Sequence, residues 1–187
     1  MNYVEYKIGK SRLIIIEGDI TKQVTHAIVN AADTELSVGG GVSGAIHRVA
    51  GPKLIEECQT LGGCNTGEAK LTKGYNLPAK SVIHTVGPIY SGKPKDREDL
   101  AKSYLNCLEI ASKNSLKSIS FPSISTGIYG YPVKEASVIA ITAIIEYLQE
   151  YEKVERVRMV LYSDEDYKIY RNTTRAVIKK HGLSTDR

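Results

Sequence analysis

The sequence predicts an α/β fold in three layers, an α/β/α arrangement with helices on both faces of a central mixed sheet. Short apolar segments alternate along the chain with longer segments whose apolar residues recur at helical spacing. Some apolar segments, such as residues 13–16, have no polar face, which is typical of strands buried on both sides. With 187 residues, 42% hydrophobic and 25% charged, the chain can bury one core, so we expect a single domain over residues 1–187.

Four strands and one interrupted helix are expected in the N-terminal half of the chain. The strand candidates are residues 13–16, 24–32, 67–74 and 81–86, and a turn at Leu77-Pro78-Ala79 separates the last two. Residues 45–58 have helical character. Gly51 and Pro52 should divide this helix into two pieces, because proline disrupts a helix interior.

The C-terminal half is expected to supply the remaining helices and strands. Residues 92–97 resemble a polar loop, and residues 100–112 carry apolar side chains at helical spacing. A short strand at 118–121 is followed by a loop rich in Gly, Ser and Thr at 122–132 and by a long helix at 133–148. A strand at 156–162 then leads to Ser163, a suitable N-cap for a terminal helix that ends near Lys180.

Composition and spacing argue against several classes of protein. No apolar run approaches the roughly 18 residues of a membrane span, and the N-terminus lacks the pattern of a signal peptide. The three cysteines form no CxxC pair, which favours a reducing, cytoplasmic environment over disulfides or zinc. The four histidines show no metal-ligand spacing, so we expect no metal and no cofactor. The net charge of +4 is mild and dispersed, so nucleic acid is not an expected partner, and we expect a monomer.

Residues 28–47 are the most informative segment for function. They consist of a buried strand, a polar turn and three consecutive glycines, Gly39, Gly40 and Gly41, at the start of a helix. Glycines let the backbone come close to a phosphate, and free N–H groups at a helix start point toward the anion. Asn30 and Asp33 lie between strand and loop, where their side chains can reach the group that carries the phosphate.

Three other interpretations of this glycine loop are weaker. Gly39, Gly41 and Gly44 satisfy the G-x-G-x-x-G pattern of dinucleotide-binding proteins, but these glycines do not follow the strand directly, as that pattern requires. A Walker loop would need a Gly-Lys-Ser/Thr sequence, which does not follow here. A helix cap or tight turn is the purely structural alternative, although three glycines exceed what a cap needs.

A second loop strengthens the phosphate interpretation. Residues 121–132 also follow a strand, precede a helix and offer hydroxyls and two glycines. Two such loops at the carboxyl ends of strands can face each other across a crevice, and together they suit a diphosphate. Asp19, which follows the first strand, could accept hydrogen bonds from an exocyclic amine such as that of adenine, or it could simply initiate a turn.

These segments together resemble the macro domain family, whose members bind ADP-ribose. The resemblance covers nearly the whole chain and rests on the order of its motifs. They are Gly18-Asp-Ile-Thr21, Ile28-Val-Asn-Ala-Ala32, Gly39-Gly-Gly-Val42, Gly44-Ala-Ile-His47, Gly67-Glu-Ala69, His84-Thr-Val-Gly-Pro88 and residues 121–130. Within the family the chain is similar to the MacroD-like branch, whose members remove ADP-ribose from acidic side chains and deacetylate O-acetyl-ADP-ribose.

The resemblance implies a role for each matching position. Asp19 would bind the adenine amino group with Ile20 beside it, and Tyr162 would pack on the adenine. Backbone N–H groups of the two loops would hold the diphosphate, and Tyr129 would also contact the distal ribose. The binding positions are Asn30, Ala31, Gly39, Gly40, Gly41 and Val42 on the first side and Ser125, Thr126, Gly127, Ile128 and Tyr129 on the second.

Two positions depart from the family pattern. Asp33 stands where the family has an asparagine, and Ser43 stands where it has an aspartate, both at the distal ribose. An aspartate only accepts hydrogen bonds, but it can act as a general base, which an asparagine cannot. One hypothesis is therefore that the site's carboxylate has moved from position 43 to position 33, which makes Asp33 and Ser43 the candidate catalytic residues.

Two functions follow from these observations, and a third is weaker. The first is hydrolysis of ADP-ribosyl esters on Asp or Glu, or of O-acetyl-ADP-ribose, by a water that the bound substrate positions. The second is a binding module that recognises ADP-ribose or ADP-ribosylated proteins without useful catalysis, which the departures at Asp33 and Ser43 favour. Binding of RNA or poly-ADP-ribose is suggested by the net charge alone.

Overall fold

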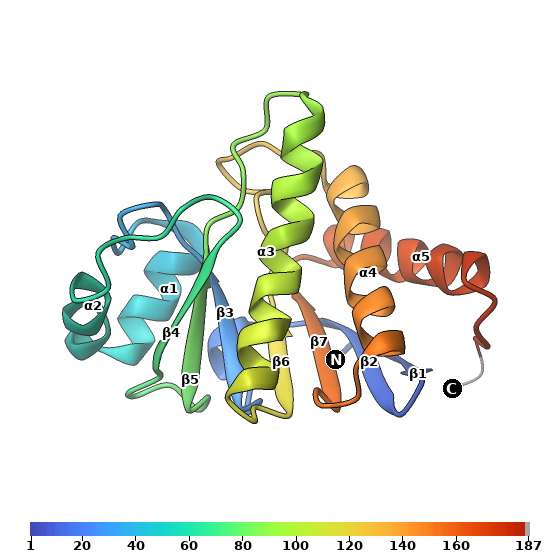
Figure 1. The fold of residues 1–187 in the computed structure, drawn as a ribbon, viewed down its shortest axis with the longest axis horizontal. Coiled ribbons are helices and arrows are strands. Elements are labelled where there is room, and N and C mark those ends of the chain that lie inside the picture. The colour runs from blue at the N-terminus through green and yellow to red at the C-terminus, as the bar shows by residue number, and fades with distance from the viewer. Residues whose placement is uncertain (186–187) are drawn as a thin grey trace.

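The computed structural model describes residues 1–185. Figure 1 shows a central sheet with helices packed against it. Within the described residues the sheet has seven strands in the order β1-β2-β7-β6-β3-β5-β4. Their bounds are β1 Tyr3–Ile8, β2 Ser11–Glu17, β3 Ala27–Ala31, β4 Ala69–Lys73, β5 Ser81–Thr85, β6 Ser118–Phe121 and β7 Arg156–Leu161.

The sheet is mixed, as the sequence predicts. Its middle strands β2, β7, β6, β3 and β5 pair in parallel, whereas the edge strands β1 and β4 pair antiparallel with β2 and β5. Parallel strands place their carboxyl ends at one edge of a sheet, and ligands of such sheets bind outside that edge. The loops that follow β2, β3, β5, β6 and β7 therefore gather where a site is expected.

Helices cover both faces of the sheet and complete the three layers. Successive residues of a strand face opposite sides, so Ala27 and Val29 join one apolar cluster and Ile28 joins the other. The first cluster packs under α3, α4 and α5, and the second packs under α1 and α2 (Figure 1). Their bounds are α1 Gly41–Ala50, α2 Pro52–Gln59, α3 Pro94–Lys113, α4 Val133–Glu150 and α5 Asp164–Lys180.

The N-terminal strand β1 is absent from the sequence-based prediction. Its burial alternates, with Val4, Tyr6 and Ile8 directed into the core. The alternation is a strand signal, but it is short, and it acquires its meaning only when β1 pairs with β2. The strand expected at residues 24–32 begins later, at Ala27, and Val24 is 76% exposed.

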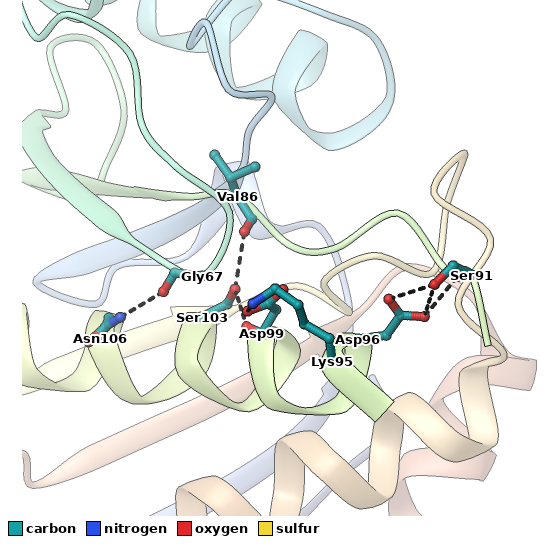
Figure 2. A network of polar contacts seen from close by, with 8 residues as sticks. All are labelled: Gly67, Val86, Ser91, Lys95, Asp96, Asp99, Ser103 and Asn106. Carbon is teal, nitrogen blue, oxygen red and sulfur yellow. Dashed lines mark hydrogen bonds and ion pairs between the residues drawn. The ribbon is translucent and has the colours of Figure 1, made fainter. Parts of the chain in front are cut away.

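The start of α3 is a second correction. Pro94 begins this helix, so the polar loop expected at residues 92–97 is wrong for its last four positions. Proline is favoured in the first turn of a helix, and the Asp96 carboxylate accepts hydrogen bonds from the Ser91 N–H at 2.7 Å and from the Ser91 hydroxyl. Figure 2 shows this anchor together with Ser103, which donates to the Val86 carbonyl, and Asn106, which donates to the Gly67 carbonyl. The helix thereby fixes the segments on either side of β4 and β5.

None of the helices in residues 1–185 is long and apolar enough to cross a membrane. Cys58, Cys64 and Cys107 are buried and free. Among the described residues, no group of three or more His, Cys, Asp or Glu side chains is arranged to hold a metal ion.

Candidate functional site

A cavity of about 260 Å³ lies at the carboxyl ends of β3, β5 and β6. Two loops provide most of its wall, and Gly87, two residues after β5, completes it. The predicted site residues on the wall are Ala31, Asp33, Gly39, Gly40, Gly41, Val42, Ser43, Ser125, Gly127, Ile128 and Tyr129. The structure therefore brings together the two loops that, from the sequence, could face each other across a crevice.

The first loop presents backbone N–H groups to the cavity. Gly39 and Gly41 have positive φ angles of 61° and 53°, and Gly40 between them has a φ of −110°. Glycine adopts positive φ angles at little steric cost, so these residues let the backbone make the tight turn that leads into α1. The helix α1 begins at Gly41, and no side chain of the described residues caps it. The N–H groups of its first turn thus remain available to a ligand.

The second loop is braced from beneath by two buried tyrosines. The Tyr104 hydroxyl donates to the Pro122 carbonyl at 3.3 Å and accepts from the Ile124 N–H at 3.1 Å. The Tyr170 hydroxyl lies 2.7 Å from the Ser123 hydroxyl, which also accepts from Thr126 at 2.8 Å. Thr126 is therefore part of the loop's internal support, and it does not line the cavity.

The neighbouring segment after β5 fixes the far end of the second loop. The Tyr90 N–H donates to the Tyr129 carbonyl at 2.8 Å, and the Tyr90 and Tyr131 rings lie 4.8 Å apart. Ser91, next to Tyr90, is held by Asp96 (Figure 2). Gly87 is needed here because a Cβ at that position would lie 2.6 Å from Ile124 Cγ2 and still closer to Ser125 Oγ. The Gly-Pro pair after a strand was the available signal for Gly87, which sequence reasoning did not assign to the site.

Asp33 braces its own loop. Its Oδ1 accepts from the N–H groups of Glu35 at 3.1 Å and Ser37 at 2.9 Å, and its Oδ2 accepts from the Ser37 hydroxyl. Burial acts to raise the pKa of Asp33, but the hydrogen bonds from Ser37, Glu35 and Leu36 outweigh it and hold the pKa below its ordinary value. A carboxylate with a lowered pKa and both oxygens occupied is a poor base. This geometry argues against the hypothesis that Asp33 activates water.

Ser43 and Asn30 form the polar floor behind the cavity. The Ser43 hydroxyl accepts from Asn30 Nδ2 at 3.3 Å and lies 3.5 Å from the Ser37 carbonyl. Ser37 thus links Asp33 to Ser43, a role that sequence reasoning missed. Neither neighbour of the Ser43 hydroxyl is a base, so the structure supports a binding role for Ser43 and gives it no means of acting as a nucleophile.

His84 orients Asn30 from below. Its Nδ1 lies 3.2 Å from Asn30 Nδ2, and its Nε2 lies 2.8 Å from Thr72 Oγ1. The neutral imidazole with a proton on Nε2 satisfies both contacts, because Nδ1 then accepts and Nε2 donates. Burial, and less strongly His47, lowers the pKa of His84 to about 3. These contacts give His84 a structural role.

Three polar side chains, on the cavity wall or on the strand and helix that carry it, have atoms without partners among residues 1–185, and of the three only Ser125 lines the cavity itself. They are Oδ1 of Asn30, both ring nitrogens of His47 and Oγ of Ser125, and each residue is at most 6% exposed. Burial lowers the pKa of His47, although the charge of Asp33 acts in the opposite direction. Unpaired buried polar atoms are costly, so their concentration here marks a place where a polar ligand or water completes the structure.

The residues predicted to bind adenine lie apart from this cavity, at the ends of β2 and β7. Asp19 Oδ1 accepts from the Thr21 N–H at 2.9 Å and from the Thr21 hydroxyl at 2.7 Å, which makes Asp19 the N-cap of a short 3₁₀ helix, η1 Ile20–Lys22. Ile20 is buried, whereas the Tyr162 ring is 87% exposed. An open hollow at these strand ends is lined by Glu17, Gly18 and Tyr162 together with the N-terminal residues Met1 and Asn2.

The fold and the two-loop cavity define an anion-binding α/β domain, and comparison with known proteins identifies its family. The family model for the macro domain matches residues 29–140. The macro domain-containing protein CT2219 of Chlorobaculum tepidum is 54% identical over 162 residues, which cover 86% of this chain and 94% of that protein. This chain belongs to the macro domain family.

Other relatives carry a named activity or a bound nucleotide. ADP-ribose glycohydrolase MACROD2 of Xenopus laevis is 49% identical over 89% of this chain, but the chain spans only 40% of that protein. A structure of the Oceanobacillus iheyensis macrodomain with ADP has a TM-score of 0.93 at 46% identity, covering 96% of this chain and 98% of that one. A Trypanosoma brucei macrodomain in complex with ADP-ribose has a TM-score of 0.82 at 44% identity, covering 86% and 68%.

Proposed function

We propose that this chain binds ADP-ribose and hydrolyses ADP-ribosyl esters, either on Asp and Glu side chains or in O-acetyl-ADP-ribose. One observation carries the proposal: two loops, one of them leading into the uncapped start of α1, line a single cavity. Relatives named ADP-ribose glycohydrolase and similar structures with ADP or ADP-ribose support it.

The cavity suits the diphosphate and distal ribose of such a ligand. The helix start at Gly41 supplies a partial positive charge and free N–H groups, which favour an anion. Ser125 has a positive φ of 68°, a conformation that non-glycine residues rarely adopt, and its hydroxyl has no partner among the described residues. Backbone strain of this kind is typical of ligand-binding sites, and a bound ligand would give the Ser125 hydroxyl a hydrogen-bond partner.

Hydrolysis would add water across the ester, releasing ADP-ribose and a free carboxylic acid. We propose that the rate comes mainly from holding the ester and a water in place. Asp33 would contribute by fixing the wall of the distal-ribose pocket through Ser37, and Ser43 by contacting the sugar. This assigns Asp33 a positioning role in place of the base that the sequence favours.

A non-catalytic reader of ADP-ribose is the second candidate, and one observation favours it. The only carboxylate of the described residues on the cavity wall is Asp33, and its own loop occupies both oxygens. A reader would need the same two loops to bind the ligand, but it would need no activated water. The free, buried cysteines support the further proposal that either function operates in a reducing compartment.

One assay separates the two functions. The protein is incubated, in separate reactions, with a substrate protein that carries ADP-ribose on Glu or Asp and with O-acetyl-ADP-ribose, and released ADP-ribose is measured over time. The hydrolase proposal predicts release at a rate proportional to the enzyme concentration. If calorimetry shows that ADP-ribose binds but none is released, the protein is a reader. If ADP-ribose neither binds nor is released, both functions are excluded.

A further inference from the structure

Gln23 is a buried side chain whose two amide atoms connect the base-binding end of the site to the sheet. Only 8% of the residue is exposed. Its Nε2 donates to the Asp19 carbonyl at 3.1 Å, and its Oε1 accepts from Arg158 Nη1 at 2.9 Å. We propose that Gln23, oriented by Arg158, is a positioning residue that sets the specificity of Asp19 for an adenine base. This inference rests on the proposed binding of ADP-ribose.

The backbone carbonyl and one carboxylate oxygen of Asp19 are engaged by neighbours. The Asp19 carbonyl accepts from the Lys22 N–H at 3.2 Å as well as from Gln23, so both of its lone pairs are used. Oδ1 accepts twice from Thr21. In the described part of the chain, Oδ2 is left as the carboxylate oxygen that a ligand can use. The bond from Gln23 therefore helps to fix where that one oxygen lies.

Arg158 determines which way the Gln23 amide faces. A guanidinium only donates, so it selects the amide oxygen and leaves Nε2 for Asp19. Arg158 comes from the middle of β7, and its residue partners in the sheet are Ile14 of β2 and Ser120 of β6. Gly18 also lies close, since a Cβ there would be 3.7 Å from Gln23 Nε2. Gln23 thus ties the loop after β2 to the rigid centre of the sheet.

The chemistry of the base makes the consequence specific. Adenine carries an amino group at position 6, which donates to a carboxylate, whereas hypoxanthine carries a carbonyl there, which a carboxylate repels. Hydrogen bonds to charged groups are stronger than neutral ones, and a correctly placed carboxylate should favour adenine by at least tenfold. If Asp19 is displaced, this preference falls while the diphosphate contacts of the other two loops persist.

Gln23→Glu is the sharpest variant for a test. It keeps the shape and the acceptor for Arg158, but it replaces the donor to the Asp19 carbonyl with an acceptor. Gln149→Glu on the exposed face of α4 adds the same charge and is the matched control. Gln23→Ala, which adds no charge, must show the same loss of preference for adenine as Gln23→Glu. Calorimetry would measure the affinity of each protein for ADP-ribose and for its hypoxanthine analogue.

We expect wild type and Gln149→Glu to prefer ADP-ribose, and both Gln23 variants to lose most of that preference, by about fivefold or more. General loosening of the fold would weaken both ligands equally and leave their ratio unchanged, so an unchanged ratio overturns the proposal. Equal affinity of wild type for ADP-ribose and for its hypoxanthine analogue would also overturn this proposal, but it would leave the proposed function intact. Failure of wild type to bind ADP-ribose would overturn both.

Discussion

Acidification from pH 7 to pH 5 should destabilise this protein through His84. The ring is 1% exposed, and it is held neutral between Asn30 and Thr72. Its pKa is about 3 in the folded protein, against an ordinary value of 6.5 that applies to the unfolded chain. At a pH between these two pKa values, His84 carries a proton in the unfolded state but not in the folded state. Stability therefore falls as the pH drops below about 6.5, and the loss is complete near pH 3.

The size of the effect follows from the two pKa values. One pKa unit corresponds to about 1.4 kcal/mol, and pH 5 lies about 1.5 units below the unfolded pKa. His84 alone should thus cost about 2 kcal/mol of unfolding free energy between pH 7 and pH 5. His47 acts in the same direction because burial lowers its pKa too. A change of this size is a substantial part of the stability of an ordinary domain.

Urea unfolding at pH 7 and pH 5 would measure this loss. Wild type should lose about 2 kcal/mol or more, and His84→Gln should lose much less, because glutamine does not titrate. His26→Gln is the matched control, since it makes the same replacement at an exposed histidine, whose Nδ1 accepts from the Lys117 N–H at 3.0 Å. The reasoning fails if His84→Gln and wild type lose the same free energy, or if wild type loses none.

Three further predictions concern the cavity. Gly127→Glu should fold normally, because a Cβ there meets no atom within 4 Å. Repulsion between the new carboxylate and the diphosphate should weaken ADP-ribose binding at least tenfold, and an unchanged affinity in calorimetry would contradict this. Asp33→Asn keeps the Oδ1 acceptor and should retain hydrolysis within about tenfold, whereas Asp33→Ala should lose more; a drop of a hundredfold or more in Asp33→Asn would identify a general base after all. Gly87→Ala should displace the second loop, costing about 1–3 kcal/mol in urea unfolding and lowering ADP-ribose affinity; normal affinity would show that the loop position is unimportant.

Local patterns were sufficient to predict most of the fold. The strand at residues 118–121 and the break at Gly51 and Pro52 lie where the sequence places them, and Ser163 caps α5 by accepting from the Asp166 N–H. These features depend on neighbouring residues alone. β1 depends on its pairing with β2, so its short alternation predicts little by itself. The first turn of α3 does carry a local signal, with Pro94 at the start of the helix and Asp96 bonded to Ser91, but its polar residues also resemble those of a loop.

The site was only partly predictable for the same reason. Glycine loops after strands indicate phosphate, and the order of strands brings two of them together. The side-chain contacts that support the site, in contrast, join residues far apart in the sequence. Asn30 and His84 are 54 residues apart, and Gln23 and Arg158 are 135 apart, so no local pattern reports them.

The assignment of Asp33 shows where pattern and geometry diverge. A carboxylate in place of an amide suggests new acid–base chemistry when only the sequence is visible. The structure shows that Ser37, four residues later, occupies that carboxylate through both its N–H and its hydroxyl. An Asp that bonds to following backbone groups is a known turn signal, and it was available in the sequence.

The central claim is that two backbone loops form a clamp for the diphosphate of ADP-ribose. Calorimetric titration with ADP-ribose and, separately, with adenosine tests it most directly, because adenosine keeps the base and lacks the diphosphate. We predict clear saturable binding of ADP-ribose and binding of adenosine that is at least a hundredfold weaker. Equal affinity for the two ligands, or no binding of ADP-ribose, would contradict the account.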